Sequence, residues 1–186
     1  MNISRGLLGL AFAMSLVART PAQDAKAPAE RMGPVAFQNF AGGTYFHLSA
    51  RVTTAQLSAQ TPLMTQRLLQ VLKDAGIQTL GPLLIIQRGA SQDQAQPFDQ
   101  EVGVLVPKGT APFGDAKVRE LSVFPCATAI TSGDFAGAAG QSVFMELFKA
   151  AGAKGRIPSG EFREMLLFWE GPASANNLMQ IQIGLQ

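Results

Sequence analysis

One succession of hydrophobic patterns occurs twice in this 186-residue chain, and it constrains the fold more than any other feature. In each stretch, an amphipathic helical segment precedes two apolar segments of strand length. The helical segments Leu68–Gly76 (LLQVLKDAG) and Phe144–Gly152 (FMELFKAAG) align with each other, and Glu101–Val104 (EVGV) aligns with Gln182–Leu185 (QIGL) around a glycine. The alternative interpretation is chance similarity between two amphipathic helices. The succession predicts an α+β domain in which two βαββ-type halves form a pseudo-repeat around a central ligand cleft.

The two halves are expected at about residues 44–107 and 117–186. Thr61 and Pro62 suit the N-cap and first turn of the first helix, and Gly76 suits its end. Residues of both helices recur at helical spacing, namely Met64, Leu68, Val71, Leu72 and Ala75, then Phe144, Leu147, Phe148 and Ala151. Strands are predicted over 44–52, 83–87, 101–106, 162–169 and 179–185, with an extended segment over 118–131 that breaks at Pro125.

The first 22 residues have the pattern of a secretory signal peptide. A short segment ending in Arg5 precedes 13 uncharged residues, Gly6–Ala18, and small residues at Thr20 and Ala22 suit cleavage after Ala22. A spanning helix needs about 20 apolar residues, so no stable membrane anchor is expected after cleavage. The alternatives are an uncleaved anchor or a wrongly assigned start. We therefore expect an exported protein, periplasmic or secreted, with a flexible linker over 23–43 and one domain over 44–186.

Cleavage would change the charge of the chain. The full chain has 15 basic and 13 acidic residues, and loss of Arg5 and Arg19 leaves 13 of each. The remaining basic residues are scattered, with no patch interleaved with aromatic residues. Nucleic acid is therefore not an expected partner.

Few residues offer metal or nucleophilic chemistry. One cysteine, Cys126, excludes a disulfide framework and a multi-cysteine metal site, and it is expected to be a buried free thiol. One histidine, His47, excludes a histidine metal cluster and is expected to be structural. Asp99 and Glu101 share one face of a strand, where a solvent-facing edge or structural role is favoured over acid–base work. No metal or cofactor is expected.

Five segments, in order, resemble the GyrI-like small-molecule-binding family, which includes effector-binding domains of AraC-type and MerR-type regulators. They are Gly81-Pro82 with the following LLIIQ, Phe98–Val106 (FDQEVGVLV), Gly133–Phe135 (GDF), Arg163–Leu166 (REML) and Ile181–Gly184 (IQIG). The resemblance covers about Tyr45 to the C-terminus. It implies two βαββ halves with a central cleft, here in a stand-alone exported member without a DNA-binding domain.

Glu164 is the main candidate for a ligand contact. Strand alternation puts it on one side with Phe162, Leu166 and Phe168, while Arg163, Met165, Leu167 and Trp169 share the other side. Met165 and Leu167 suit packing on the helices, so Glu164 is expected to face the cleft. The resemblance implies that this glutamate lies in the ligand pocket, and a carboxylate among aromatic rings suits a cationic ligand. The alternative is a structural glutamate paired with Arg163.

The other expected ligand-binding residues are apolar or aromatic. Leu166 stands where the family has a tyrosine, and this departure puts a hydrolytic mechanism in doubt while leaving apolar binding possible. Tyr45 and Phe46 on the first strand are cleft candidates, with ordinary core packing as the alternative for both. The complete set is Phe162, Glu164, Leu166, Phe168, Trp169, Tyr45 and Phe46.

The sequence thus predicts exported, non-catalytic binding of a small apolar or cationic molecule, with Glu164 as the charged contact. Whether the protein is an enzyme stays open. The resemblance also allows a hydrolase in which Glu164 activates water on a reactive ligand, because some family members are hydrolases. A protein-interaction module is the third alternative, as gyrase-inhibiting relatives suggest. The sequence does not determine the oligomeric state.

Overall fold

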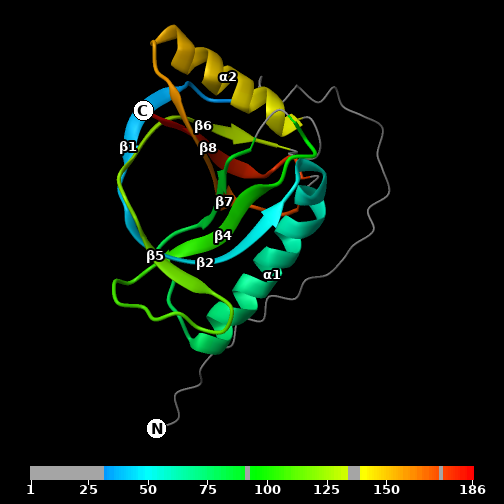
Figure 1. Ribbon diagram of the computed structural model, residues 1–186, viewed down its shortest axis with the longest axis vertical. Coiled ribbons are helices and arrows are strands. Elements are labelled where there is room, and N and C mark those ends of the chain that lie inside the picture. The colour runs from blue at the N-terminus through cyan, green and yellow to red at the C-terminus, as the bar shows by residue number, and fades with distance from the viewer. Residues whose placement is uncertain (1–31, 91–92, 134–138, 172–173) are drawn as a thin grey trace.

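One antiparallel sheet of eight strands, in the order β1-β6-β8-β7-β3-β4-β2-β5, organises the chain (Figure 1). The computed structural model describes residues 32–90, 93–133, 139–171 and 174–186. The predicted signal peptide lies outside them. The strands are β1 Ala36–Phe40, β2 Gly43–Val52, β3 Leu83–Arg88, β4 Phe98–Val106, β5 Lys117–Leu121, β6 Phe124–Ser132, β7 Pro158–Phe168 and β8 Leu178–Leu185. The helices are α1 Leu57–Ala75 and α2 Ala139–Ala153, with a 3-10 turn, η2 Thr54–Gln56, before α1.

The predicted α+β class is confirmed. Along the chain, β2–α1–β3–β4 is followed by β6–α2–β7–β8, so strand, helix, strand and strand occur twice in this order. The innermost strands, β3 and β7, pair with each other at the middle of the sheet. Whether the two halves are a true internal repeat stays a prediction.

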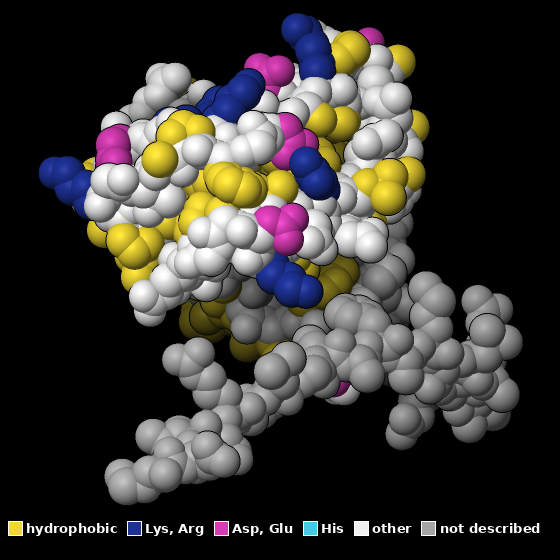
Figure 2. Space-filling model, turned by 90° about the horizontal axis from the view of Figure 1, so that it is seen from below, with side chains coloured by type: hydrophobic (Ala, Val, Ile, Leu, Met, Phe, Trp, Pro, Cys, Tyr) yellow, Lys and Arg dark blue, Asp and Glu magenta, His cyan; other side chains and the backbone are white. Residues whose placement is uncertain are grey.

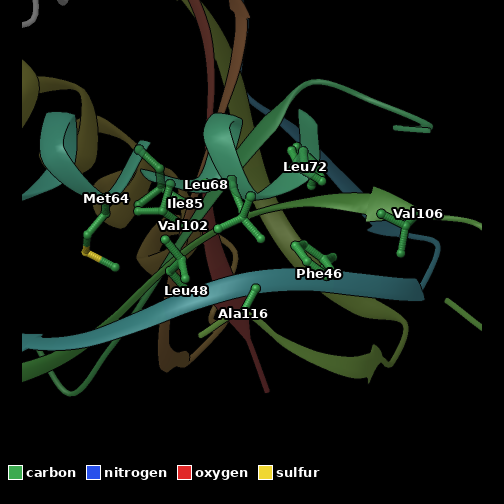
Figure 3. Close-up of a cluster of buried hydrophobic side chains, with 11 residues drawn as sticks. Phe46, Leu48, Met64, Leu68, Leu72, Ile85, Val102, Val106 and Ala116 are labelled. Atoms are coloured by element: carbon green, nitrogen blue, oxygen red, sulfur yellow. The ribbon is translucent and has the colours of Figure 1, made fainter. Parts of the chain in front are cut away.

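The two helices pack on the same side of the sheet, over different strands. Helix α1 covers β2 and β4, and α2 covers β6 and β8. Figure 3 shows the cluster under α1, where Phe46 and Leu48 of β2 meet Leu68 and Leu72 of the helix. The cluster under α2 is formed by Ala127, Ala129, Val143, Leu147, Ala151, Met179, Ile181, Ile183 and Leu185. The central strands β3 and β7 therefore run between the two helix-covered regions, and Figure 1 shows α1 and α2 over different parts of the sheet.

The first helix begins earlier than predicted. Thr61 is not its N-cap, because the helix starts at Leu57 and holds Pro62 inside it. The backbone N–H of Thr53 donates to Gln56 Oε1 at 2.9 Å, which fixes the turn that runs into the helix. Pro62 lacks an N–H and so forgoes a helical hydrogen bond. The predicted end is confirmed, because Gly76 adopts φ 62° at the C-cap.

Two expectations are wrong, one about the linker over 23–43 and one about the break in the segment 118–131. The second part of the predicted linker forms β1, in which Ala36 to Phe40 pair with Thr128 to Phe124 of β6. Edge pairing of this kind needs no apolar alternation, so composition did not reveal it. The break in the segment 118–131 lies at 122–123, between β5 and β6, and Pro125 lies inside β6. Within the described ranges, no helix is both long and apolar enough to cross a membrane.

Candidate functional site

Glu164 lies at the centre of the sheet, on the side that carries the helices. In register it stands between Ile85 of β3 and Ile181 of β8, and these two residues belong to the clusters under α1 and α2. Cross-strand neighbours share a side of a sheet, so Glu164 points to the strip between the helices. The expectation that Met165 packs on the helices is wrong: Met165 packs against a smaller cluster on the opposite side.

Phe162 and Leu166 lie on the same side as Glu164, as alternation predicts. Leu166 packs against both helix-covered clusters, which places it between them. Phe162 makes edge-to-face contacts with Phe144 and Phe148 of α2, each with ring centroids 5.8 Å apart. The carboxyl group of Glu164 therefore has one aromatic and one aliphatic neighbour along its own strand.

The Glu164 carboxylate has no charged or hydrogen-bonding partner among the described residues. Its side chain is half-buried, and burial raises the pKa of Glu164 to about 7. The alternative pairing with Arg163 is excluded by geometry. Arg163 lies on the opposite side of the sheet and pairs with Glu161, with Nη2 2.6 Å from Oε1. An unpaired carboxyl group in an apolar strip is costly to ionise, so a cation placed beside it would be strongly favoured.

Phe168 does not share a side with Glu164, contrary to the alternation argument. Leu166 pairs with Met179, but Phe168 pairs with Leu178, so β7 contains one extra residue at Leu167. This bulge reverses the alternation and places Phe168 on the side opposite to Glu164. Leu167 is itself 38% exposed. The expectation that it packs on the helices is therefore wrong.

Trp169, the residue that follows β7, is 43% exposed, and Phe168 is 52% exposed. Both side chains therefore lie at an open end of the strand, where an exposed indole ring can report a nearby ligand.

The structure separates the two aromatic candidates of β2. Phe46 is fully buried in the cluster under α1 (Figure 3). This cluster includes Ile85, the cross-strand neighbour of Glu164, so it lies on the same side of the sheet as Glu164. Tyr45 is fully buried on the opposite side, where its hydroxyl donates to Leu84 O at 2.8 Å. Tyr45 therefore does not come together with Glu164.

A network of ion pairs on the side opposite to Glu164 was missed by the sequence reasoning. Glu101 accepts hydrogen bonds from Arg88 at 3.0 Å and from Arg119 at 2.7 Å. Its pKa is lowered because these bonds outweigh the opposing effect of burial. Glu101 is thus structural, but not at an edge, because β4 lies inside the sheet. Charged residues within apolar strands indicated that ion pairs must exist. The sequence could not show which residues pair, because the members of the network come from four different strands.

The single histidine and the single cysteine have structural surroundings. His47 is 3% exposed and stacks on Tyr45, with ring centroids 5.0 Å apart. Cys126 is a buried free thiol, as expected, and burial raises its pKa to about 11. Such a thiol is a poor nucleophile at neutral pH. In the described part of the chain, no three His, Cys, Asp or Glu side chains are grouped so as to hold a metal ion.

The predicted central cleft does not correspond to the open hollows of the surface. Two hollows, of about 300 and 600 Å³, are lined by residues near Arg88, and Glu164 lines neither. Part of the space on the helix side is filled by Phe162 and the two aromatic rings of α2 that it contacts. A ligand at Glu164 would therefore have to displace apolar side chains.

Charged side chains are dispersed on the face seen in Figure 2. Lys and Arg side chains there are interspersed with Asp and Glu, and hydrophobic side chains lie between them. That face therefore lacks the single-sign basic surface that binds a nucleic-acid backbone.

Solved structures share this fold at low sequence identity, whereas neither a protein-family model nor a curated protein sequence matches the chain. The C-terminal domain of EcmrR has a TM-score of 0.70 and 14% identity, over 82% of this chain and 97% of that domain. In a complex of EcmrR with DNA, the TM-score is 0.71 at 13% identity, over 84% of this chain, which spans 58% of that EcmrR chain.

Two further structures are similar. SAV2435 bound to tetraphenylphosphonium has a TM-score of 0.59 and 15% identity, over 83% of this chain and 94% of that chain. A hydrolase from Listeria innocua has a TM-score of 0.50 and 10% identity, over 87% of this chain and 94% of that chain. The chain therefore has the fold of the EcmrR C-terminal domain, as the resemblance to the GyrI-like family predicts.

Proposed function

We propose that this chain binds a small lipophilic cation on the helix-bearing side of the sheet, with Glu164 as the charged contact. The observation that carries the proposal is an unpartnered, half-buried carboxyl group at the centre of the sheet, between Ile85 and Ile181. A positive charge beside it would offset the cost of ionising it in apolar surroundings. SAV2435, a protein of similar fold, binds the lipophilic cation tetraphenylphosphonium.

The neighbours of Glu164 suit the apolar part of such a ligand. Phe162 and Leu166 flank it on β7, and an aromatic face stabilises a nearby cation by cation–π attraction. Because Phe162 contacts Phe144 and Phe148, we expect these rings to separate when the ligand enters. Phe46, buried in the cluster under α1 on the same side of the sheet, and Trp169, just after β7, are more distant members of the proposed site, whereas Phe168 lies on the opposite side and is not part of it.

Binding of tetraphenylphosphonium should strengthen with pH. Because the pKa of Glu164 is about 7, only a minor fraction of the protein is ionised at pH 6 and most of it at pH 8. If the ionised form alone binds the cation, the apparent affinity rises about tenfold over this interval. Isothermal titration calorimetry at both pH values measures the change, and Trp169 fluorescence gives a second reading.

Two variants and one neutral ligand control this experiment. Glu164→Gln should bind weakly at both pH values and lose the pH dependence, because the amide carries no charge. Glu146→Gln makes the same charge change on α2, at a side chain that is 45% exposed, and should behave as wild type. Neutral triphenylphosphine oxide should show no pH dependence. Equal binding by wild type and Glu164→Gln would refute the charge role.

A hydrolase is the second candidate function, because a carboxyl group with a pKa of about 7 is suited to act as a general base at neutral pH. The absence of a tyrosine at Leu166 argues against it. An activated aryl ester distinguishes the two functions. Turnover that disappears in Glu164→Gln would favour hydrolysis, whereas cation binding without turnover favours the binding function.

We also propose that the protein is exported and cleaved after Ala22. The support is the sequence pattern of residues 1–22, and cleavage there would leave every described residue in the mature chain. Intact-mass measurement of the protein from the exported fraction should give a chain that begins at Gln23. A full-length chain retained in the cell would contradict the proposal.

A further inference from the structure

Five charged residues form a connected ion network on the side of the sheet opposite to Glu164. Arg88 bridges the two carboxylates, with Nη1 3.0 Å from Glu101 and Nε 2.6 Å from Glu161. Arg119 Nη2 lies 2.7 Å from Glu101, and Arg163 Nη2 lies 2.6 Å from Glu161. The residues come from β3, β4, β5 and β7, which brings distant parts of the sequence together.

The network has more positive than negative charge. Three guanidinium groups share two carboxylates, which leaves one unit of positive charge without a counterion inside the network. His47 lies 3.7 Å from Glu101, and burial lowers its pKa, so it adds no charge at neutral pH. Burial, together with the charges of Arg119 and Arg88, lowers the pKa of Arg163, as expected for crowded positive groups.

Two guanidinium groups keep one nitrogen each for another acceptor. Arg119 bonds Glu101 through Nε and Nη2, and Arg163 contacts Glu161 through Nε and Nη2. Among the described residues, neither Nη1 has a partner. A guanidinium group presents five N–H donors in a planar fork, which matches the geometry of a carboxylate.

An open hollow of about 600 Å³ adjoins these arginines. Its walls are partly apolar, because Val123, Phe124, Pro125 and Leu185 line it beside Arg88, Arg119 and Arg163. The Arg163 guanidinium lies 3.6 Å from the centroid of the Phe124 ring and its side chain is only 7% exposed. Glu120 also lines the hollow, but it pairs with Thr44 on the other side of the sheet, where its carboxylate accepts a hydrogen bond from Thr44 Oγ1 at 2.6 Å.

We propose that this hollow binds a small organic carboxylate. Its carboxylate group pairs with the guanidinium groups of Arg119 and Arg163, and its apolar part lies against Val123 and Phe124. The excess positive charge selects a monoanion, and the apolar walls favour an organic acid over an inorganic anion. This site is separate from Glu164, and the proposal does not depend on binding of a cation there.

Titration of the full chain with benzoate at low salt, followed by NMR, tests the proposal. Arg119→Gln should weaken benzoate binding about tenfold or more, because a charge-assisted contact is lost. Glu161→Gln should strengthen binding, because it removes a competing carboxylate, and an unfolded variant cannot mimic this gain. Arg67→Gln makes the same charge change in an exposed pair with Asp115 at 3.1 Å and should leave binding unchanged.

Several results would overturn the proposal. One is the absence of saturable benzoate binding to wild type, and another is equal weakening by Arg119→Gln and Arg67→Gln. Neutral benzyl alcohol should not bind, and inorganic phosphate should bind more weakly than benzoate. Phosphate binding as tight as that of benzoate would show that the apolar walls play no part.

Discussion

Replacing Glu164 by Gln should raise the free energy of unfolding by about 3 kcal/mol at pH 8 and leave it unchanged at pH 4. The folded state holds the pKa of Glu164 at about 7, against 4.5 for an ordinary glutamate. Below pH 4.5 the carboxyl group is protonated in both states, so the raised pKa costs nothing. As the pH rises from 4.5 to 7, the carboxyl group ionises in the unfolded state but stays protonated in the folded state, and the wild type loses stability that the amide retains.

Chemical denaturation at several pH values measures this difference. Its magnitude should grow between pH 4.5 and 7 and then become constant. Glu146→Gln, on the half-exposed part of α2, is the control for a general change in charge and should not reproduce the pH dependence. A difference between wild type and Glu164→Gln that is the same at pH 4 and pH 8 would mean that the carboxyl group is not in apolar surroundings.

Periodicity predicted the elements well, but it could not say which side of the sheet the helices cover. Alternation correctly separated Glu164 from Arg163, and the structure keeps them on opposite sides. We expected the helices on the side of Met165, whereas they lie on the side of Glu164 and Leu166. Alternation could not decide between the two sides, because Met165 and Leu166 are both apolar and either could pack on a helix. The register with Ile85 and Ile181 decides the question, and this register is a property of three strands together.

Irregular pairing was the second limit. The bulge at Leu167 reverses the side of Phe168, and no local residue pattern announces it. The strand β1 (AFQNF) lies in a segment assigned to a linker, because its apolar residues do not alternate and edge pairing is satisfied by backbone hydrogen bonds alone.

The ion network was invisible for a related reason. Glu101 and Arg119 are 18 residues apart and Arg88 and Glu161 are 73 residues apart, so no spacing rule connects them. The family resemblance was more informative about the fold than any single residue pattern, because it concerned the order of several segments at once.

Replacing Gly103 by Ala should be among the most destabilising single substitutions in the sheet, with a loss of about 3 kcal/mol. A methyl group there would overlap the carbonyl oxygen of Phe46 and would lie 2.6 Å from Tyr45 Cε2 and 2.7 Å from His47 Cβ. The stacked rings of Tyr45 and His47 lie over this strand, and Gly103 is the position that lets them approach. The carbonyl belongs to the backbone of β2, which pairs with β4 on one side and β5 on the other, so it cannot easily move aside.

Two other glycines make this prediction specific. A methyl group at Gly184, which the sequence aligns with Gly103, would meet Ser159 Oγ and the Phe124 ring, at 2.7 Å from Cε2. These are side chains that can shift, so Gly184→Ala should cost less than Gly103→Ala. Gly152, in α2, has no atom within 4 Å of the added group, and alanine there should stabilise the helix by up to about 1 kcal/mol. In thermal unfolding, Gly103→Ala should therefore be the least stable of the three variants, Gly184→Ala intermediate and Gly152→Ala the most stable. A Gly103→Ala protein as stable as Gly152→Ala would show that the rings over β4 are not packed as described.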